Sequence, residues 1–310
     1  MSAAVLEAPG RARTVEVARP EPGAGQVRVR LEGCGICGSN LPLWEGRPWF
    51  EYPREPGAPG HEGWGVIDAV GEEVDRWATG DRVAFLSDHA FAEYDLAAAD
   101  ALARIPEPLA GRAFPGEALA CAMNVFARTG IEAGQRVAIV GIGFLGAVLV
   151  QLATRAGARV TAVSRRPFAR DVAREMGAAE AVSLERAADA FSAGLADCAI
   201  EVTGQQAPLD LAAELTRVRG RLIIAGYHQD GPRTVNMQLW NWRGLDVVNA
   251  HERDPRVYVA GIRSAADAIA SGALDPEPLY THRVPLDALG RGLELLRERP
   301  DGFLKALVLT

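Results

Sequence analysis

Two residues in the first third of the chain could bind a transition metal. Cys37 and His61 offer a thiolate sulfur and an imidazole nitrogen, which are ligand types that suit zinc. Taken alone, such a pair would more often be a buried thiol and a core histidine. Here both residues lie in glycine-rich segments, Gly35-Ile-Cys37-Gly-Ser39 and Gly60-His61-Glu62, which are typical of loops that can aim ligands at a cleft. The pattern therefore favours a zinc site.

A second chemical motif lies near the middle of the chain. Gly141, Gly143 and Gly146 form a complete G-x-G-x-x-G, with Phe144 and Leu145 between the last two glycines. The apolar run 136–140 predicts a buried strand before the motif, and an apolar helix is expected after it. A strand, turn and helix of this kind present free amides to the pyrophosphate of a dinucleotide. The alternative is a glycine-rich turn with no ligand.

The residues after the next expected strand, Arg159–Val163, distinguish the two nicotinamide cofactors. An acidic residue at this position would hold the ribose 2′-hydroxyl of NAD. This chain has Ser164-Arg165-Arg166 instead, with no carboxylate and with two guanidinium groups that can pair with a 2′-phosphate. The sequence therefore favours NADP(H) over NAD(H), with Thr203 as a further expected cofactor contact. The alternative is that both arginines are solvated surface charges.

The elements that must position these motifs change character near residue 115. Before it, short strand-like runs such as Gln26–Leu31 alternate with turns, which predicts an antiparallel β-rich domain. After it, strands alternate with helices, including a helix over Leu209–Val218, which predicts a doubly wound parallel sheet. We therefore expect an α/β fold, with a β-rich domain of residues 1–119 and 253–310 and a Rossmann dinucleotide-binding domain of residues 120–252.

Composition argues against several classes of partner. The net charge of −7 disfavours nucleic acid and anionic membrane surfaces. The longest apolar run, 137–150, contains glycines and is too short to span a bilayer. The start of the sequence lacks a basic segment followed by an apolar stretch, so we expect no secretory signal. The 4 cysteines form no disulfide framework, which fits a reducing cytoplasm.

With these motifs identified, the chain resembles the zinc-containing medium-chain alcohol and polyol dehydrogenases. The run Gly60-His61-Glu62-x-x-Gly65-x5-Gly71-x-x-Val74 matches the zinc signature of that family, and Gly80-Asp81-Arg82-Val83 matches the turn that follows it. The resemblance covers nearly the whole chain, from Gln26 to the last strand-like run, Phe303–Leu309. It implies a GroES-like catalytic domain and a Rossmann cofactor domain.

The resemblance also implies a set of zinc ligands. Cys37 and His61 match the first two catalytic ligands, and Glu62 matches the glutamate beside the site, which can ligate or exchange with water. In polyol dehydrogenases a third ligand lies in a Glu-Pro-Leu run, which Glu117-Ala-Leu matches apart from the proline. Cys121, one helical turn further along, is the competing candidate.

Two departures from the family pattern change the expectations. No cysteine occurs between Cys37 and Cys121, so the four-cysteine structural lobe is missing and we expect one zinc, in the catalytic site. Asn40 replaces the aspartate that usually supports the zinc-bound histidine. Its neutral amide can still fix the imidazole tautomer, with a smaller gain in ligand basicity. Cys34 is expected to be a small buried residue.

The expected activity is hydride transfer between a nicotinamide cofactor and a secondary alcohol, polyol or sugar-like substrate and its ketone. Ser39 would begin the proton relay, unless its hydroxyl only bonds its own turn. We expect a homodimer or homotetramer that binds a small alcohol or ketone but neither nucleic acid nor membranes.

Two alternatives stay open at this stage. One is a zinc-free quinone or enoyl reductase of the same superfamily, although such chains lack the cysteine and the Gly-His-Glu motif. The other is a cofactor-binding protein with weakened catalysis, which Asn40 allows. Trp44, Trp49, Phe50 and Arg54 could line a substrate pocket or simply pack their loop. His251 could approach the cleft, and Asn124 could face the nicotinamide or the substrate.

Overall fold

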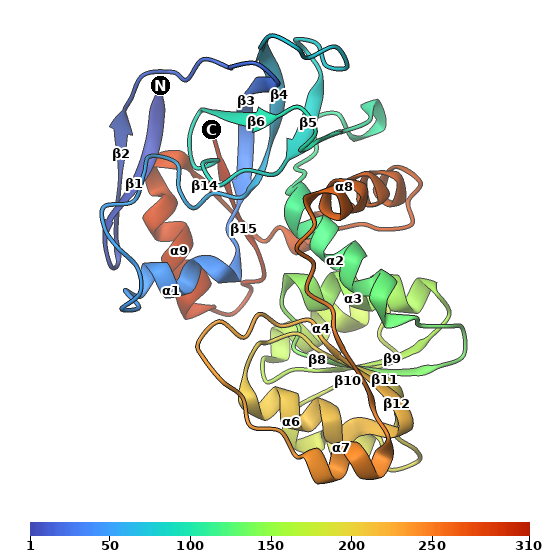
Figure 1. The fold of residues 1–310 in the computed structure, drawn as a ribbon. Helices are drawn as coiled ribbons and strands as arrows, with labels where there is room; N and C mark the ends of the chain where they lie inside the picture. The colour runs from blue at the N-terminus through green and yellow to red at the C-terminus, as the bar shows by residue number, and fades with distance from the viewer. The chain divides into compact units, whose positions relative to one another are not determined.

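The computed structural model describes residues 1–310, which divide into two compact units (Figure 1). The first unit contains Met1–Ala120 and Arg253–Thr310, and the second contains Cys121–Glu252. Helix α2 (Gly116–Thr129) includes the point at which the first unit ends.

The first unit is built mainly from antiparallel strands. β1 (Ser2–Ala8) and β2 (Arg11–Glu16) form a two-stranded sheet. Seven further strands form a sheet in the order β14-β15-β3-β4-β5-β7, with β6 also paired to β3. Their bounds are β3 (Gln26–Gly35), β4 (Glu62–Val70), β5 (Arg82–Phe85), β6 (Tyr94–Ala98), β7 (Leu102–Arg104), β14 (His282–Pro285) and β15 (Ala306–Leu309). Because β15 pairs with β3, the last strand of the chain completes the sheet beside the candidate metal loops.

Helices close one side of this unit. α9 (Leu289–Glu298) packs against β2, β14 and β15, and α1 (Leu41–Trp44) lies next to it (Figure 1). The buried leucines of α9 recur at helical spacing, at Leu289, Leu293 and Leu296, so one face of the helix enters the core. The other helical segments of the unit are α8 (Pro255–Ala270) and the 3-10 turns η1 (Gly38–Asn40), η2 (Glu107–Leu109), η4 (Glu277–Leu279) and η5 (Leu286–Ala288).

The second unit is a parallel six-stranded sheet in the order β10-β9-β8-β11-β12-β13. Its strands are β8 (Arg136–Val140), β9 (Arg159–Val163), β10 (Glu180–Val182), β11 (Ala196–Glu201), β12 (Thr216–Ile224) and β13 (Asp246–Asn249). Along the chain this order is third, second, first, fourth, fifth and sixth, which is doubly wound. The direction of winding reverses between β8 and β11, and ligands of such sheets bind at the carboxyl ends of the strands at that point.

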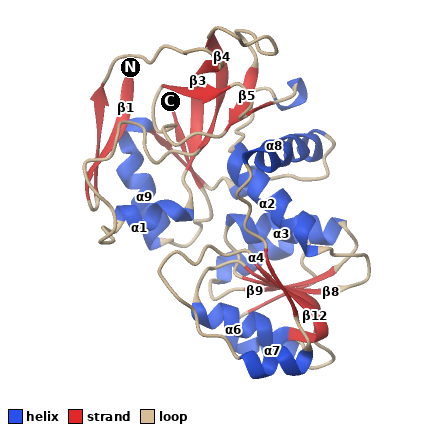
Figure 2. Ribbon diagram, in the orientation of Figure 1, coloured by secondary structure: helices blue, strands red, loops and turns tan.

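Helices cover both faces of this sheet (Figures 1 and 2). α3 (Phe144–Arg155) and α4 (Pro167–Glu175) lie on one face, and α6 (Gln206–Leu215) and α7 (Met237–Arg243) on the other. The short segments η3 (Leu184–Arg186) and α5 (Ala187–Ala190) follow β10. Double coverage explains why all of residues 137–140 are apolar and buried. None of the helices combines the length and the apolar character needed to cross a membrane.

The structure differs from the sequence-based expectation at two boundaries. The predicted helix Leu209–Val218 is wrong at its end, because α6 stops at Leu215 and β12 begins at Thr216. The Thr216 hydroxyl donates to the Ala212 carbonyl at 2.7 Å, and Thr216 and Val218 are β-branched residues that favour a strand. In the first unit, β3 continues to Gly35, four residues beyond the predicted strand end. Because of this extension, Cys37 lies just past the carboxyl end of the strand.

Candidate metal centre and dinucleotide loop

Two neighbouring strands bring the candidate zinc ligands together. Cys37 lies two residues after the end of β3, and Glu62 is the first residue of β4. Gly35 of β3 pairs directly with Glu62 of β4, so the two loops meet at one edge of the sheet. The sulfur of Cys37, an imidazole nitrogen of His61 and a carboxylate oxygen of Glu62 all lie within 4.8 Å of one another. These are donors that zinc accepts in proteins, so the group fits this ion.

Hydrogen bonds orient the imidazole ring of His61. Its Nδ1 lies 2.9 Å from the carbonyl oxygen of Pro59, which can only accept, so Nδ1 carries a proton. The Ser39 hydroxyl lies 3.4 Å from Nε2, which is the nitrogen left for a metal. The expectation that Asn40 fixes the tautomer is wrong in its detail. Asn40 instead donates to the same Pro59 carbonyl at 3.3 Å and accepts from the backbone amide of Cys37 at 2.9 Å.

Negative groups around His61 create a strong demand for positive charge. Burial lowers the pKa of His61, but its hydrogen bond with Cys37 and the charges of Cys37, Glu117 and Glu62 outweigh this and raise the pKa to about 10. In the metal-free chain a proton on the His61 imidazole therefore balances the negative charge of its neighbours. A divalent cation could take the place of this proton, as happens when a metal binds to a histidine ligand.

A buried lysine, Lys305, neutralises the charge of Glu62. The sequence analysis gave Lys305 no role. Glu62 is 0% exposed and Lys305 is 4% exposed, and the ammonium nitrogen lies 2.7 Å from Oε1 and 2.5 Å from Oε2. A Cβ atom on Gly35 would overlap the Glu62 carboxylate, so a glycine is needed there. Lys305 is the only lysine in the sequence, among 33 basic residues, and this singularity was a signal that could have drawn attention to it.

Glu117 shares a pocket with His61 at the start of α2. The pocket has a volume of about 440 Å³. Burial raises the pKa of Glu117 to about 7, and the positive charges of His61 and Lys305 only partly offset this effect. Glu117 is not a member of the close group formed by Cys37, His61 and Glu62. Cys121 lies one turn further along α2, at the start of the second unit.

The remaining walls of the pocket come from segments that the sequence did not single out. They are Leu86, Ser87, Asp88, Arg253, Pro255 and Tyr258. The wall therefore offers hydroxyl, carboxylate and guanidinium groups beside the candidate ligands. Trp44, Trp49, Phe50 and Arg54 are not among its lining residues. Trp44 is buried and donates its indole N–H to Glu294 at 2.8 Å, while Trp49 is 56% exposed.

The glycine motif of the second unit has the geometry of a dinucleotide loop. Gly141 has φ +108°, which favours glycine at the tight turn after β8. A Cβ atom on Gly146 would overlap the Gly141 carbonyl oxygen, so this glycine permits close packing of α3 on the turn. A Cβ atom on Gly143 would meet nothing within 4 Å, which leaves open space at the N-cap of α3. These are the three roles that glycines have in a dinucleotide site. Phe144 and Leu145 begin α3.

The residues proposed to select the cofactor follow β9, at the same edge of the sheet. Ser164 is 7% exposed, and Arg170 holds the turn by donating to the carbonyls of Ser164 and Arg165 at 2.9 Å each. The Arg166 guanidinium donates to the Ile142 carbonyl within the glycine motif at 3.3 Å. The Arg165 side chain is exposed.

Thr203 follows β11 and packs against the motif from the other side. A Cβ atom on Gly141 would overlap the methyl group of Thr203. His251 stacks on the ring of Tyr227 at a centroid distance of 5.1 Å. Asn124 is 9% exposed, and its amide nitrogen is buried with no hydrogen-bond partner. The second unit therefore gathers the motif, the Ser164–Arg166 turn and Thr203 at one end of its sheet.

Comparisons with known proteins agree with this geometry. The family model described as alcohol dehydrogenase GroES-like domain matches residues 23–107, and the model described as zinc-binding dehydrogenase matches residues 145–265. An alcohol dehydrogenase of Rhizobium meliloti (strain 1021) is 30% identical, with 73% of this chain and 77% of the relative covered. A sorbitol dehydrogenase of Bacillus subtilis (strain 168) is 27% identical, with 99% and 97% covered.

Solved structures show the same fold. A structure described as a zinc-binding dehydrogenase from Sinorhizobium meliloti 1021, bound to NADP, is 28% identical with a TM-score of 0.84. It covers 100% of this chain, and this chain covers 99% of it. The two family models, the relatives and the shared fold lead to one conclusion. This chain belongs to the zinc-containing medium-chain alcohol and polyol dehydrogenase family, with a GroES-like unit and a Rossmann unit.

Proposed function

We propose that this chain is a zinc-dependent dehydrogenase that transfers a hydride between NADP(H) and a secondary alcohol, polyol or sugar-like substrate and its ketone. The observation that carries the proposal is the close group of Cys37, His61 and Glu62, whose donor atoms lie within 4.8 Å of one another. The names of the relatives, alcohol dehydrogenase and sorbitol dehydrogenase, support the reaction class.

Cys37, His61 and Glu117 would hold the zinc, with Glu62 as an exchanging fourth ligand. Glu117 is favoured over Cys121 because it lines the pocket that contains His61. Lys305 donates to Oε1 of Glu62 and balances its charge, while Oε2 of Glu62 makes no hydrogen bond, so Oε2 would be the oxygen offered to the metal. We propose a single zinc per chain, because Cys34 and Cys198 are both buried inside strands and offer no second cysteine cluster.

The residues of the chain would prepare the site for chemistry. When bound, zinc supplies a Lewis acid that lowers the pKa of the substrate hydroxyl, and NADP supplies a hydride acceptor. The Pro59 carbonyl holds the His61 ring with Nε2 toward the metal position. Ser39, half-buried and 3.4 Å from that nitrogen, would take the hydroxyl proton and pass it outward. Ser87 and Asp88 in the pocket wall would bind further hydroxyls of a polyol.

NADP(H) is favoured by the turn after β9. The exposed Arg165 guanidinium and the nearby Arg166 would pair with a 2′-phosphate, and a relative of known structure is described as bound to NADP. The test is the dissociation constant of both reduced cofactors for Arg165→Ala, with Arg159→Ala, at the opposite end of β9, as the matched control. We expect Arg165→Ala to raise the dissociation constant of NADPH by about tenfold and to leave that of NADH unchanged. Arg159→Ala should change neither constant. Equal weakening of both cofactors, or tighter NADH than NADPH binding in the unmodified chain, would overturn the preference.

The activity itself is tested with a panel of alcohols, polyols and ketones, before and after zinc removal by a chelator. We expect nicotinamide-linked turnover of a secondary alcohol or polyol that disappears on zinc removal and returns when zinc is added. Turnover of quinones or enoyl compounds by zinc-free protein would favour the reductase alternative. Cofactor binding without turnover of any substrate would favour the protein with weakened catalysis.

We also propose that the chain forms at least a dimer, through the free edge of the Rossmann sheet. β13 pairs only with β12, so its other edge is open, and it carries Val247 at 39% exposed. Val218 of β12 and Trp242 of α7 add exposed apolar surface, at 59% and 86%. Light scattering on Trp242→Glu should show a smaller particle than the unmodified chain. An unmodified chain that is already monomeric would overturn this proposal.

A further inference from the structure

A carboxylate that the proposed chemistry does not use lies at the end of β11. Glu201 is 0% exposed. One of its oxygens accepts from the amide and hydroxyl of Thr203 and from the Gly204 amide at 2.9 Å. The other oxygen lies 3.1 Å from Nε2 of His228. A buried carboxylate that accepts this many hydrogen bonds holds in place the turn whose groups donate to it.

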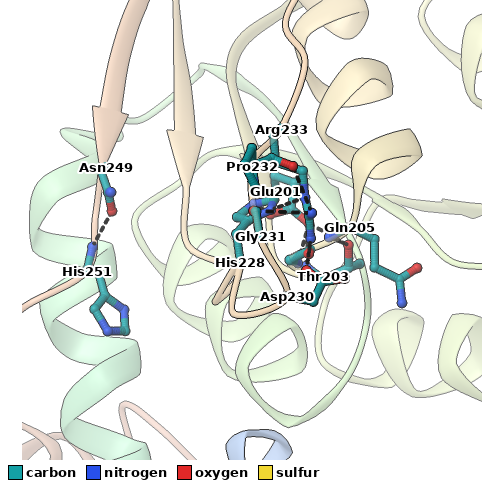
Figure 3. Close-up of polar contacts among 11 residues, drawn as sticks. Glu201, Thr203, Gln205, His228, Asp230, Gly231, Pro232, Arg233, Asn249 and His251 are labelled. Carbon is teal, nitrogen blue, oxygen red and sulfur yellow. Dashed lines mark hydrogen bonds and ion pairs between the residues drawn. The ribbon is translucent and has the colours of Figure 1, made fainter. Parts of the chain in front are cut away.

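The contacts continue from His228 to a guanidinium group (Figure 3). Nε of Arg233 donates to Nδ1 of His228 at 2.9 Å. Because a guanidinium can only donate, Nδ1 holds a lone pair and the ring proton is on Nε2, which donates to Glu201. Arg233 is itself held by the carboxylate of Asp230 and by the Gly204 carbonyl at 2.7 Å. Every donor therefore faces an acceptor, and the direction of each hydrogen bond is determined.

This set of contacts ends at the dinucleotide loop. The turn that Glu201 fixes contains Thr203, whose methyl group occupies the space beside Gly141. Gly141 follows β8 and Thr203 follows β11, the two strands between which the winding of the sheet reverses. A shift of the Thr203 turn would therefore change the shape of the turn that has to receive the pyrophosphate.

We propose that His228 and Arg233 are positioning residues for the dinucleotide, acting through Glu201 on the Thr203 turn. They hold Thr203 against Gly141 and so set the affinity for the cofactor without contacting the metal ligands. The inference rests on the proposed function in one respect, that a nicotinamide dinucleotide binds at this loop. It gives a role to three charged or polar residues of the second unit that the proposed chemistry leaves unexplained.

The experiment is a titration of the zinc-loaded full chain with NADPH, with no alcohol present, followed by the fluorescence of the reduced nicotinamide. His228→Phe removes both ring hydrogen bonds, and we expect it to raise the dissociation constant about tenfold or more. His228→Gln can still donate to Glu201 and accept from Arg233, so it should stay within about threefold of the unmodified chain. The matched control is His89→Phe, which removes an exposed histidine–carboxylate pair, with Glu55 at 3.0 Å, in the first unit.

A second variant and a kinetic measurement separate positioning from general loss of structure. Arg233→Met should also raise the dissociation constant of NADPH. It tests the inference independently if His228→Phe does not fold. In steady-state assays, the KM for the cofactor should rise while kcat, the KM for the alcohol and the zinc content stay unchanged. Equal weakening by His228→Gln and His228→Phe, or changes in zinc content and alcohol KM of the same size, would indicate a merely structural role and overturn the inference.

Failure of the inference is distinct from failure of the proposed function. If the unmodified chain binds NADPH and all variants bind it equally well, only the positioning role is overturned. If the unmodified chain binds neither NADPH nor NADH, the proposed function is overturned and the inference with it.

Discussion

Removing the ammonium group beside Glu62 should strongly destabilise the zinc-free protein. Lys305 is 4% exposed and Glu62 is 0% exposed, so Lys305→Met leaves a buried carboxylate without the ammonium group that contacts both of its oxygens. Breaking a buried pair from one side costs about 3–5 kcal/mol. The whole free energy of unfolding of a natural protein is about 5–15 kcal/mol, so this loss is a large share of it.

The assay is urea unfolding of zinc-free protein at pH 7, followed by tryptophan fluorescence. The double variant Glu62→Gln with Lys305→Met removes both charges and should recover most of the loss, because no buried charge is left unpaired. Arg256→Met removes one partner of the exposed pair with Asp254, at 2.8 Å, and should leave the unfolding midpoint unchanged.

Two results would refute this reasoning. One is a loss of less than about 1 kcal/mol in Lys305→Met, the size expected of a surface pair. The other is a double variant that is no more stable than the single one, because the loss would then come from packing rather than from the unpaired carboxylate.

Two further predictions follow from single residues in the second unit. Gly146→Ala should raise the dissociation constant of NADPH about tenfold or more with zinc content unchanged, because the new Cβ overlaps the Gly141 carbonyl; unchanged binding would contradict the assigned packing role. Burial raises the pKa of Cys198 to about 12, so its reactive thiolate appears only as the pH rises toward that value. At pH 8 iodoacetamide should therefore modify Cys198 only after unfolding, and rapid labelling of the folded chain, read by peptide mass, would show that the thiol is not buried as described.

The second unit was the easier part to predict from sequence. β8 and β9 match the predicted ranges because strands of a doubly covered parallel sheet are continuous apolar runs, and glycine or proline marks where the neighbouring helices begin and end. The boundary between α6 and β12 could not be predicted in the same way. No turn residue separates the two elements, and pairing of Thr216 with Ala196 of β11 decides where the strand begins.

The candidate site could be predicted where short sequence motifs contain the chemical groups. It could not be predicted where the contacting residues lie far apart in the sequence or where a backbone group makes the contact. Cys37 and His61 were predicted as candidate ligands from their types and their glycine-rich surroundings, and the structure brings their donor atoms within 4.8 Å of each other. The carbonyl of Pro59, which orients the imidazole, has no sequence signature because every residue has a carbonyl group. Lys305 is 243 positions from Glu62, and only the fold brings the two together.

The role of Glu201 was hidden for a related reason. Its hydrogen bonds are made to a turn beside it and to His228, 27 positions away, and neither partner forms a known motif with it. The pocket walls at Ser87 and Tyr258 likewise come from two distant segments of the first unit. Such groupings depend on tertiary structure, which periodicity and spacing do not specify.

The central claim is that Cys37 supplies a thiolate to one catalytic metal ion. Zinc can be replaced by cobalt, whose absorption spectrum shows a sulfur-to-metal charge-transfer band when a thiolate is bound. We expect one cobalt per chain with this band, loss of the band in Cys37→Ser, and an unchanged band in the matched control Cys198→Ser. A band that persists in Cys37→Ser, or an unmodified chain that binds cobalt without the band, would contradict the account.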